Sequence, residues 1–104
     1  MHADADIQVW LDTQLGAQQA LIVPYVRSAS DAQLQYRIAL IQHAGGGTSR
    51  INQQGRVALT AGQPASLPRL AVNPAGDGTC RLQVELQDDG KEIGTFDFDC
   101  SAKP

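Results

Sequence analysis

The chain has 104 residues, of which 42% are apolar and 18% charged, and this size and composition predict one domain spanning residues 1–104. Its 11 acidic and 8 basic residues give a net charge of −3, whereas a nucleic-acid-binding domain is expected to be basic. No apolar run approaches the roughly 20 residues that a membrane-spanning helix needs. We therefore expect neither a nucleic-acid partner nor membrane insertion. The start, MHADADIQ, lacks the charged and apolar regions of a secretory signal, so we expect a mature protein.

Apolar and polar residues alternate along most of the chain, which predicts β-strands rather than helices. A first strand is expected over residues 7–11. In the second strand, ALIVPYV, we expect Leu21, Val23 and Tyr25 to share one face. Pro24 predicts that this strand lies at a sheet edge or contains a bulge, because proline cannot donate a ladder hydrogen bond.

The third strand is followed by three glycines at positions 45–47. They do not form a phosphate-binding loop, because no Gly-Lys-Ser/Thr follows and no helical pattern begins there. We expect instead a four-residue hairpin loop at residues 44–47, which places Ile51 opposite Leu40 with both side chains inward. The outer face of this predicted hairpin then carries Gln35, Arg37, Arg50, Asn52, Gln54 and Arg56.

The final segments form a hairpin whose register follows from the two cysteines. Even-numbered residues are apolar on both strands, and centring the turn on Gly90 places Cys80 opposite Cys100. A two-residue Asp89-Gly90 turn would pair even with odd positions, so we expect a loop of three residues, or of another odd number. The two cysteines are expected to form a disulfide, which indicates an oxidising compartment.

About seven short strands separated by turn residues predict an all-β fold, an immunoglobulin-like antiparallel β-sandwich. No catalytic constellation is present, so we expect no enzyme activity and no cofactor. The cysteines lack Cys-x-x-Cys spacing, and His43 has no second ligand at metal-binding spacing. Asp88, Asp89 and Glu92 lack a calcium-loop pattern and are better explained as turn residues. We therefore expect no metal site.

The basic, amide-rich outer face has two interpretations. Polar outer faces are ordinary in β-sandwiches, so these six side chains can be no more than a solvated surface. Alternatively, the face binds an acidic, amide-rich chain, provided that the arginines cluster despite the negative net charge.

Several of these segments together resemble the CsgC/CsgH-like family of curli-assembly proteins, in its alphaproteobacterial type. The resemblance extends over about residues 7–100 and is carried by SRINQQG at 49–55, by the AGQP turn and by the late hairpin that ends in cysteine. It implies a periplasmic immunoglobulin-like domain that keeps a secreted amyloid subunit from polymerising before export. The chain lacks the Cys-x-Cys of the CsgC branch, which puts a redox role in doubt.

Two functional hypotheses follow. In the first, the protein is a monomeric chaperone-like inhibitor that binds a curli-type amyloid subunit transiently, through the basic sheet face or a strand edge. In the second, it is a structural or adhesion module of an envelope assembly without chaperone activity, and its disulfide only stabilises the fold. Addition of the protein to a polymerising subunit distinguishes the two.

Overall fold

The computed structural model describes residues 7–16, 19–44, 46–72 and 78–100, and all the regular structure in them is β. The strands are β1 (Ile7–Leu15), β2 (Ala20–Ser28), β3 (Ala32–Ala44), β4 (Gly47–Leu59), β5 (Ala65–Ser66), β6 (Leu70–Val72), β7 (Thr79–Asp88) and β8 (Lys91–Asp99). Within the described residues, no helix is long and apolar enough to cross a membrane. The segment NPAGDG at residues 73–78, whose residue types predict a turn, lies almost entirely outside the described residues.

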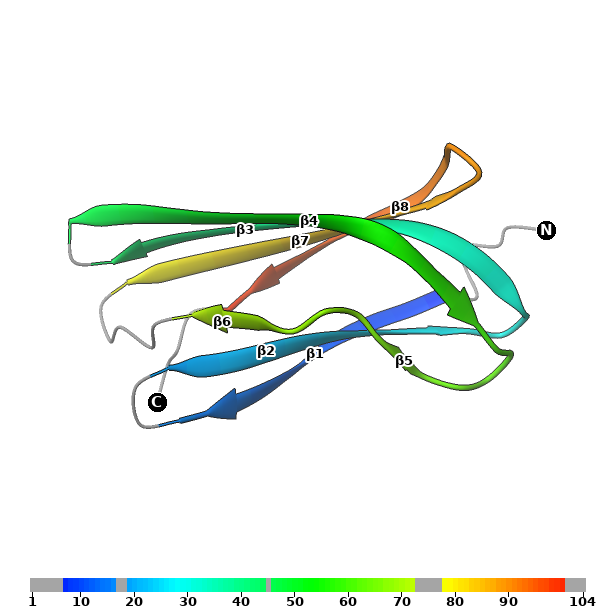
Figure 1. Cartoon of the computed structure of the whole chain (residues 1–104), viewed down its shortest axis with the longest axis horizontal. Helices are drawn as coiled ribbons and strands as arrows, with labels where there is room; N and C mark the ends of the chain where they lie inside the picture. The colour runs from blue at the N-terminus through cyan, green and yellow to red at the C-terminus, as the bar shows by residue number, and fades with distance from the viewer. Residues whose placement is uncertain (1–6, 17–18, 45, 73–77, 101–104) are drawn as a thin grey trace.

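The strands form two antiparallel sheets that pack face to face (Figure 1). In the first sheet β1 pairs with β2, and the short strands β5 and β6 both pair with the other side of β2. The second sheet has the order β4-β3-β7-β8. The predicted antiparallel β-sandwich is confirmed. The eight strands exceed the expected seven because the segment that includes Pro68 divides β5 from β6.

The core lies between the sheets and is built from alternate residues, as the sequence pattern predicts. On β3 and β7 the even-numbered side chains point inward, and Ile38 and Val84 at the centre of this layer are fully buried. Ile22 and Val26 of β2 meet them from the other sheet. Complete burial of a large aliphatic side chain stabilises the folded state by roughly 1.5–3 kcal/mol relative to leaving it exposed.

The three residues of β2 that were expected to share one face do so, and it is the face that points away from the core. Leu21, Val23 and Tyr25 are only half-buried, whereas Ile22 and Val26 lie in the core. The strand is apolar at nearly every position, so its alternation does not distinguish the two faces. On the outer face, Tyr25 stacks against Trp10 of β1, with ring centroids 5.6 Å apart, which explains why apolar residues are tolerated there.

Pro24 was expected at a sheet edge or a bulge. It lies instead in β2, the central strand of the first sheet, which pairs with β1 without a register shift. Its carbonyl oxygen accepts a hydrogen bond from the Leu67 amide at 2.8 Å, so its nitrogen faces the same side, toward β5 and β6. Residues 25 and 26 of β2 pair with β5, and residues 20–22 of β2 pair with β6. Pro24 lies at the break between these two pairings. The missing N–H therefore removes no ladder hydrogen bond.

The β7–β8 hairpin has the predicted register but not the predicted loop. Even positions pair with even positions, and Cys80 forms a disulfide with Cys100 across the hairpin, as expected. The turn is nevertheless the two-residue Asp89-Gly90 turn, with φ of 54° and 82° as a type I′ turn requires. A β-bulge at Ile93 supplies the extra residue, because Leu86 pairs with Gly94 and Gln87 with Glu92.

The β3–β4 hairpin follows the predicted register, with Leu40 opposite Ile51. The strands continue to Ala44 and Gly47, so the connection is two residues shorter than the expected four. Gly46 has φ of 80°, a backbone conformation that favours glycine. The shorter turn leaves the pairing unchanged, because residues 44 and 47 pair with each other.

Candidate protein-binding surface

The structure places all six predicted site residues on one surface, the side of the second sheet that faces away from the core. Gln35 and Arg37 come from β3, and the remaining residues are Arg50, Asn52, Gln54 and Arg56 of β4. We call these six side chains the β3–β4 outer face. The local reason is the hairpin register, in which odd-numbered β3 residues lie beside even-numbered β4 residues: Gln35 pairs with Arg56, and Arg37 with Gln54.

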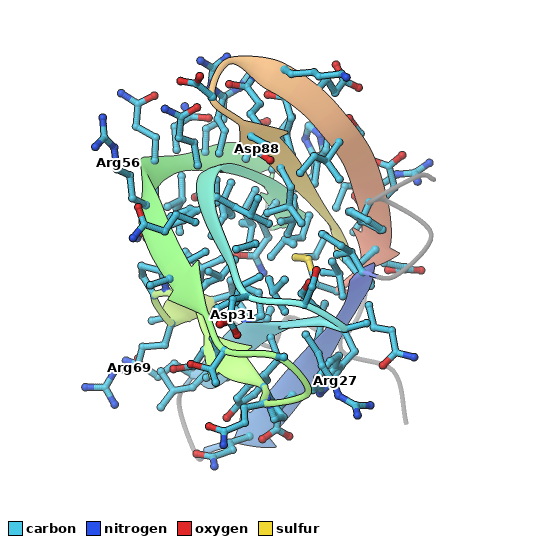
Figure 2. The ribbon with its side chains drawn as sticks, turned by 90° about the vertical axis from the view of Figure 1, so that its right-hand side faces the viewer. Arg27, Asp31, Arg56, Arg69 and Asp88 are labelled. Atoms are coloured by element: carbon cyan, nitrogen blue, oxygen red, sulfur yellow. A yellow bond between two sulfur atoms is a disulfide. The ribbon has the colours of Figure 1, made fainter. Side chains whose placement is uncertain are left out.

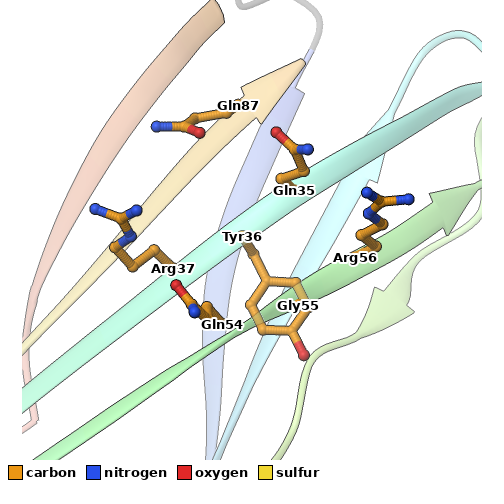
Figure 3. Close-up of a pocket in the computed structure, with 7 residues that line it drawn as sticks. All are labelled: Gln35, Tyr36, Arg37, Gln54, Gly55, Arg56 and Gln87. Carbon is orange, nitrogen blue, oxygen red and sulfur yellow. The ribbon is translucent and has the colours of Figure 1, made fainter. Parts of the chain in front are cut away.

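Four of these side chains surround an open hollow of about 450 Å³ (Figure 3). Gln35, Arg37, Gln54 and Arg56 line it together with Gln87 of β7. Amide and guanidinium groups therefore converge on a solvent-accessible surface instead of an enclosed cavity. Such a surface suits contact with a polypeptide better than enclosure of a small molecule.

The centre of this region is held by a tyrosine that packs on a glycine. Tyr36 pairs with Gly55, and its ring crosses β4 on the side opposite to Gln35 and Arg37 (Figure 3). A Cβ atom at Gly55 would lie 2.6 Å from the Tyr36 hydroxyl oxygen and 2.9 Å from Cζ. Glycine is therefore required for this close approach, and the tyrosine covers the gap that glycine leaves in the strand.

The arginines of the β3–β4 outer face differ in their pairing. Arg37 forms an ion pair with Glu85 of β7 at 3.9 Å, and its side chain is 65% exposed. Within the described part of the chain, Arg50 and Arg56 have no carboxylate at ion-pair distance. Arg56 projects from β4 into solvent (Figure 2). The unneutralised positive charge of this face is therefore concentrated on β4.

Charge changes sign across the second sheet. β4 carries Arg50 and Arg56 and no acidic residue, whereas β8 at the opposite edge carries Glu92, Asp97 and Asp99 beside one basic residue, Lys91. Three strand spacings separate these edges, about 14 Å. This distance exceeds the Debye length of roughly 8 to 10 Å at ordinary ionic strength. The acidic side chains of β8 are therefore largely screened from Arg50 and Arg56, which are themselves six residues and about 20 Å apart along β4. Asp88 and Asp89 of the β7–β8 turn line a second hollow together with Arg56.

Sequence reasoning missed the contribution of β7 to this surface. Arg81 pairs with Ile41, which pairs on its other side with Arg50, so a third strand extends the basic row. Glu85, the partner of Arg37, also comes from β7. Alternation identified the outward positions of this strand, but no local signal indicated that β7 lies beside β3.

The remaining polar clusters form no second site in the described residues. His43 and Thr48 face each other across the β3–β4 hairpin, with Nδ1 and Oγ1 2.9 Å apart. The described chain contains no group of three or more His, Cys, Asp or Glu side chains that could hold a metal ion. Asp88 and Asp89 are exposed at the β7–β8 turn, where the Gly90 amide donates to Gln35 Oε1 at 3.3 Å.

Comparison with solved structures supports the fold. A structure of the E. coli curli protein CsgC matches with a TM-score of 0.75 and 20% identity, over 90% of this chain and 97% of that chain. The solution structure of R. palustris CsgH matches with a TM-score of 0.73 and 16% identity, over 89% of this chain and 91% of that chain. At these identities the likeness concerns the fold alone.

Sequence comparison identifies the family. No curated protein sequence matches the chain significantly. The family model described as thin aggregative fimbriae synthesis protein, Tafi-CsgC, matches residues 1–95, which is nearly the whole chain. The two antiparallel sheets and the likeness to the folds of CsgC and CsgH agree with that match. The chain belongs to the Tafi-CsgC family of thin aggregative fimbriae (curli) synthesis proteins.

Proposed function

We propose that this protein is a chaperone-like inhibitor of curli-subunit polymerisation, which binds the subunit transiently through the β3–β4 outer face. One observation carries the proposal: all six basic and amide side chains lie on one face, and β4 has no acidic residue to neutralise them. Membership of a fimbriae-synthesis family supplies the kind of client. The subunit is expected to be acidic and rich in glutamine and asparagine.

The chemistry of the face suits such a client. Amyloid subunits elongate by adding strands and by stacking Gln and Asn side chains in ladders. Gln35, Asn52 and Gln54 offer the same amide groups to a subunit that has not yet joined a fibril. Arg50 and Arg56 attract acidic segments, and because exposed charges increase the rate of encounter more than the affinity, binding is transient.

The disulfide supports a location in the periplasm. Cys80 is 3% exposed and is bonded to Cys100 within one hairpin, which is a structural arrangement without an accessible thiol. Disulfides of this kind persist in oxidising compartments such as the periplasm. A client that must stay unpolymerised before export would meet the protein there.

The test is fibril growth of a purified curli-type subunit, followed by an amyloid dye, with the protein at ratios well below one. We expect the parent to lengthen the lag phase and a variant with Arg37, Arg50 and Arg56 replaced by Gln to do so much less. The replaced side chains are exposed, so stability should change by no more than about 0.5 kcal/mol. If the parent leaves the lag phase unchanged, the inhibitor function is wrong and the structural-module hypothesis takes its place.

A further inference from the structure

The β4 strand is a long and regular edge of the second sheet. Among the described strands it pairs with β3 alone, over 13 residues and without a register shift. Natural edge strands are commonly protected by proline, a bulge, short length, an inward-pointing charge or charged side chains. On β4 the charged side chains are Arg50 and Arg56, which repel a like-charged strand and attract an acidic one. β4 contains no proline, and both of its charged side chains point outward. By contrast, β8 carries a bulge, and β5 and β6 are two and three residues long. The remaining edge, β1, is also regular over nine residues, but its only charged residue is the acidic Asp12, which would repel an acidic strand.

The hydrogen-bond alternation of the second sheet determines which backbone groups of β4 are free. Cys100 N donates to Cys80 O at 2.9 Å, so the even-numbered residues of β7 bond to β8 and the odd-numbered ones to β3. On β3 the odd residues then bond to β7 and the even residues to β4. Even-numbered β3 residues lie opposite odd-numbered β4 residues, so the odd residues of β4 bond to β3. The even residues of β4 therefore direct their N–H and C=O groups to the free edge.

The free backbone groups therefore belong to the same residues that carry the site side chains. Both properties alternate with a period of two along a strand, and here they coincide on Arg50, Asn52, Gln54 and Arg56. A strand added to this edge would place alternate side chains directly beside these four on the outer face. Backbone pairing and side-chain selection would then act at the same positions.

We propose that the β4 edge receives the client as an added antiparallel or parallel strand; this inference rests on the proposed function and specifies its binding mode. The captured segment carries acidic residues six positions apart, which meet Arg50 and Arg56, with Asn or Gln at the two alternate positions between them. The order Arg-Asn-Gln-Arg on β4 has nearly the same chemistry in either direction, so both strand orientations satisfy the pattern. Such a segment is the kind that would otherwise pair with a fibril end.

A second copy of the chain fits this edge poorly. Antiparallel pairing of two complete β4 strands, Gly47 to Leu59 against Leu59 to Gly47, would place Arg50 directly opposite Arg56 at both ends of the ladder. Like charges opposite each other destabilise strand pairs. An acidic client strand has the opposite effect at the same positions, and the edge is therefore assigned to the client.

Amide hydrogen exchange tests the binding mode without any substitution. In the free protein the amides of Arg50, Asn52, Gln54 and Arg56 should exchange rapidly, while those of the intervening residues are protected by β3. Addition of the monomeric subunit should slow exchange at these even-numbered amides. An unchanged pattern on β4 in the presence of bound subunit, or new protection on β1 or β8 instead, would overturn the inference.

A proline substitution tests the same point in the polymerisation assay. Gln54→Pro removes one free-edge N–H, whereas the control Gln54→Ala removes the same side-chain amide and keeps the N–H. Loss of one backbone hydrogen bond should raise the protein concentration needed to double the lag time by about fivefold relative to Gln54→Ala. Thr95→Pro, whose N–H faces the free edge of β8 by the same alternation, should leave that concentration unchanged.

The outcomes separate this inference from the proposed function. If the parent does not delay polymerisation, the proposed function fails. If the parent delays polymerisation and the folded Gln54→Pro variant delays it to the same extent as Gln54→Ala, the proposed function stands and strand addition is wrong. If sedimentation shows a parent dimer that Gln54→Pro dissociates, the edge is a self-interface and the inference is also wrong. Circular dichroism shows whether each variant is folded. If Gln54→Pro does not fold, the hydrogen-exchange experiment on the parent protein decides between the outcomes.

Discussion

Replacing Arg50 and Arg56 together by glutamine should slow association with an acidic subunit several-fold, whereas replacing Arg37 alone should change it little. Arg37 already has Glu85 at 3.9 Å, so its charge is partly cancelled before any client arrives. Within the described residues, Arg50 and Arg56 have no such partner. The same reasoning predicts that Glu85→Gln, which releases Arg37, speeds association.

The expected magnitude follows from the strand geometry. A carboxylate on a strand beside β4 would lie about 7 Å from a guanidinium group, where attraction in water is about 0.6 kcal/mol. Screening at physiological ionic strength leaves roughly half of it. With one carboxylate beside each arginine, as in the captured segment, the double variant loses about 0.6 kcal/mol, which corresponds to a roughly threefold slower association. Glu85→Gln should accelerate association by a factor of about 1.5 to 2 by the same estimate.

Stopped-flow fluorescence with a labelled monomeric subunit measures these association rates at low, physiological and high salt. The difference between the parent and the double variant should disappear near 1 M salt, where the Debye length is about 3 Å. The matched control is Arg27→Gln combined with Lys91→Gln, which removes the same net charge from other surfaces. Equal slowing by the control and by the β4 variant would refute the reasoning, because net charge alone would then explain the effect.

Three stability predictions follow from the fold. Reduction of the Cys80–Cys100 disulfide, which spans 20 residues, should lower the free energy of unfolding by about 3 kcal/mol and the melting temperature by about 15 °C; calorimetry with and without reductant checks this. Gly55→Ala should cost roughly 1 to 2 kcal/mol in urea unfolding because the new Cβ meets the Tyr36 ring, and the cost should fall in a Tyr36→Leu background. Ile38→Ala should cost about 2 to 5 kcal/mol in the same assay, since Ile38 is fully buried; a cost below 1 kcal/mol would contradict its central place in the core.

Local pairings were predictable from the sequence. The β3–β4 register follows from alternation and a glycine-rich turn, and it placed the six site residues on one face. The β7–β8 register follows from two apolar sets and two cysteines that must meet. The bulge at Ile93 was not predictable, because one extra residue changes the loop length while leaving the apolar faces aligned.

Non-local features were not predictable. The inward face of β2 could not be identified from the sequence because ALIVPYV offers apolar side chains to both faces, and the outer ones are accommodated by the Trp10–Tyr25 pair. Pro24 indicated an edge, but a break in the neighbouring strand accommodates it within the sheet. The neighbours of β3 depend on a pairing between distant segments, so the partial neutralisation of Arg37 by Glu85 appears only in three dimensions.

The central claim is that the subunit binds the β3–β4 outer face, and residue-resolved NMR tests it most directly. Heteronuclear spectra of the labelled protein would be recorded while unlabelled monomeric subunit is added at low salt. The account predicts that the largest shift changes and line broadening fall on residues 50–56 of β4 and on Gln35 and Arg37 of β3. Perturbations confined to the first sheet, around Trp10 and Tyr25, would contradict it.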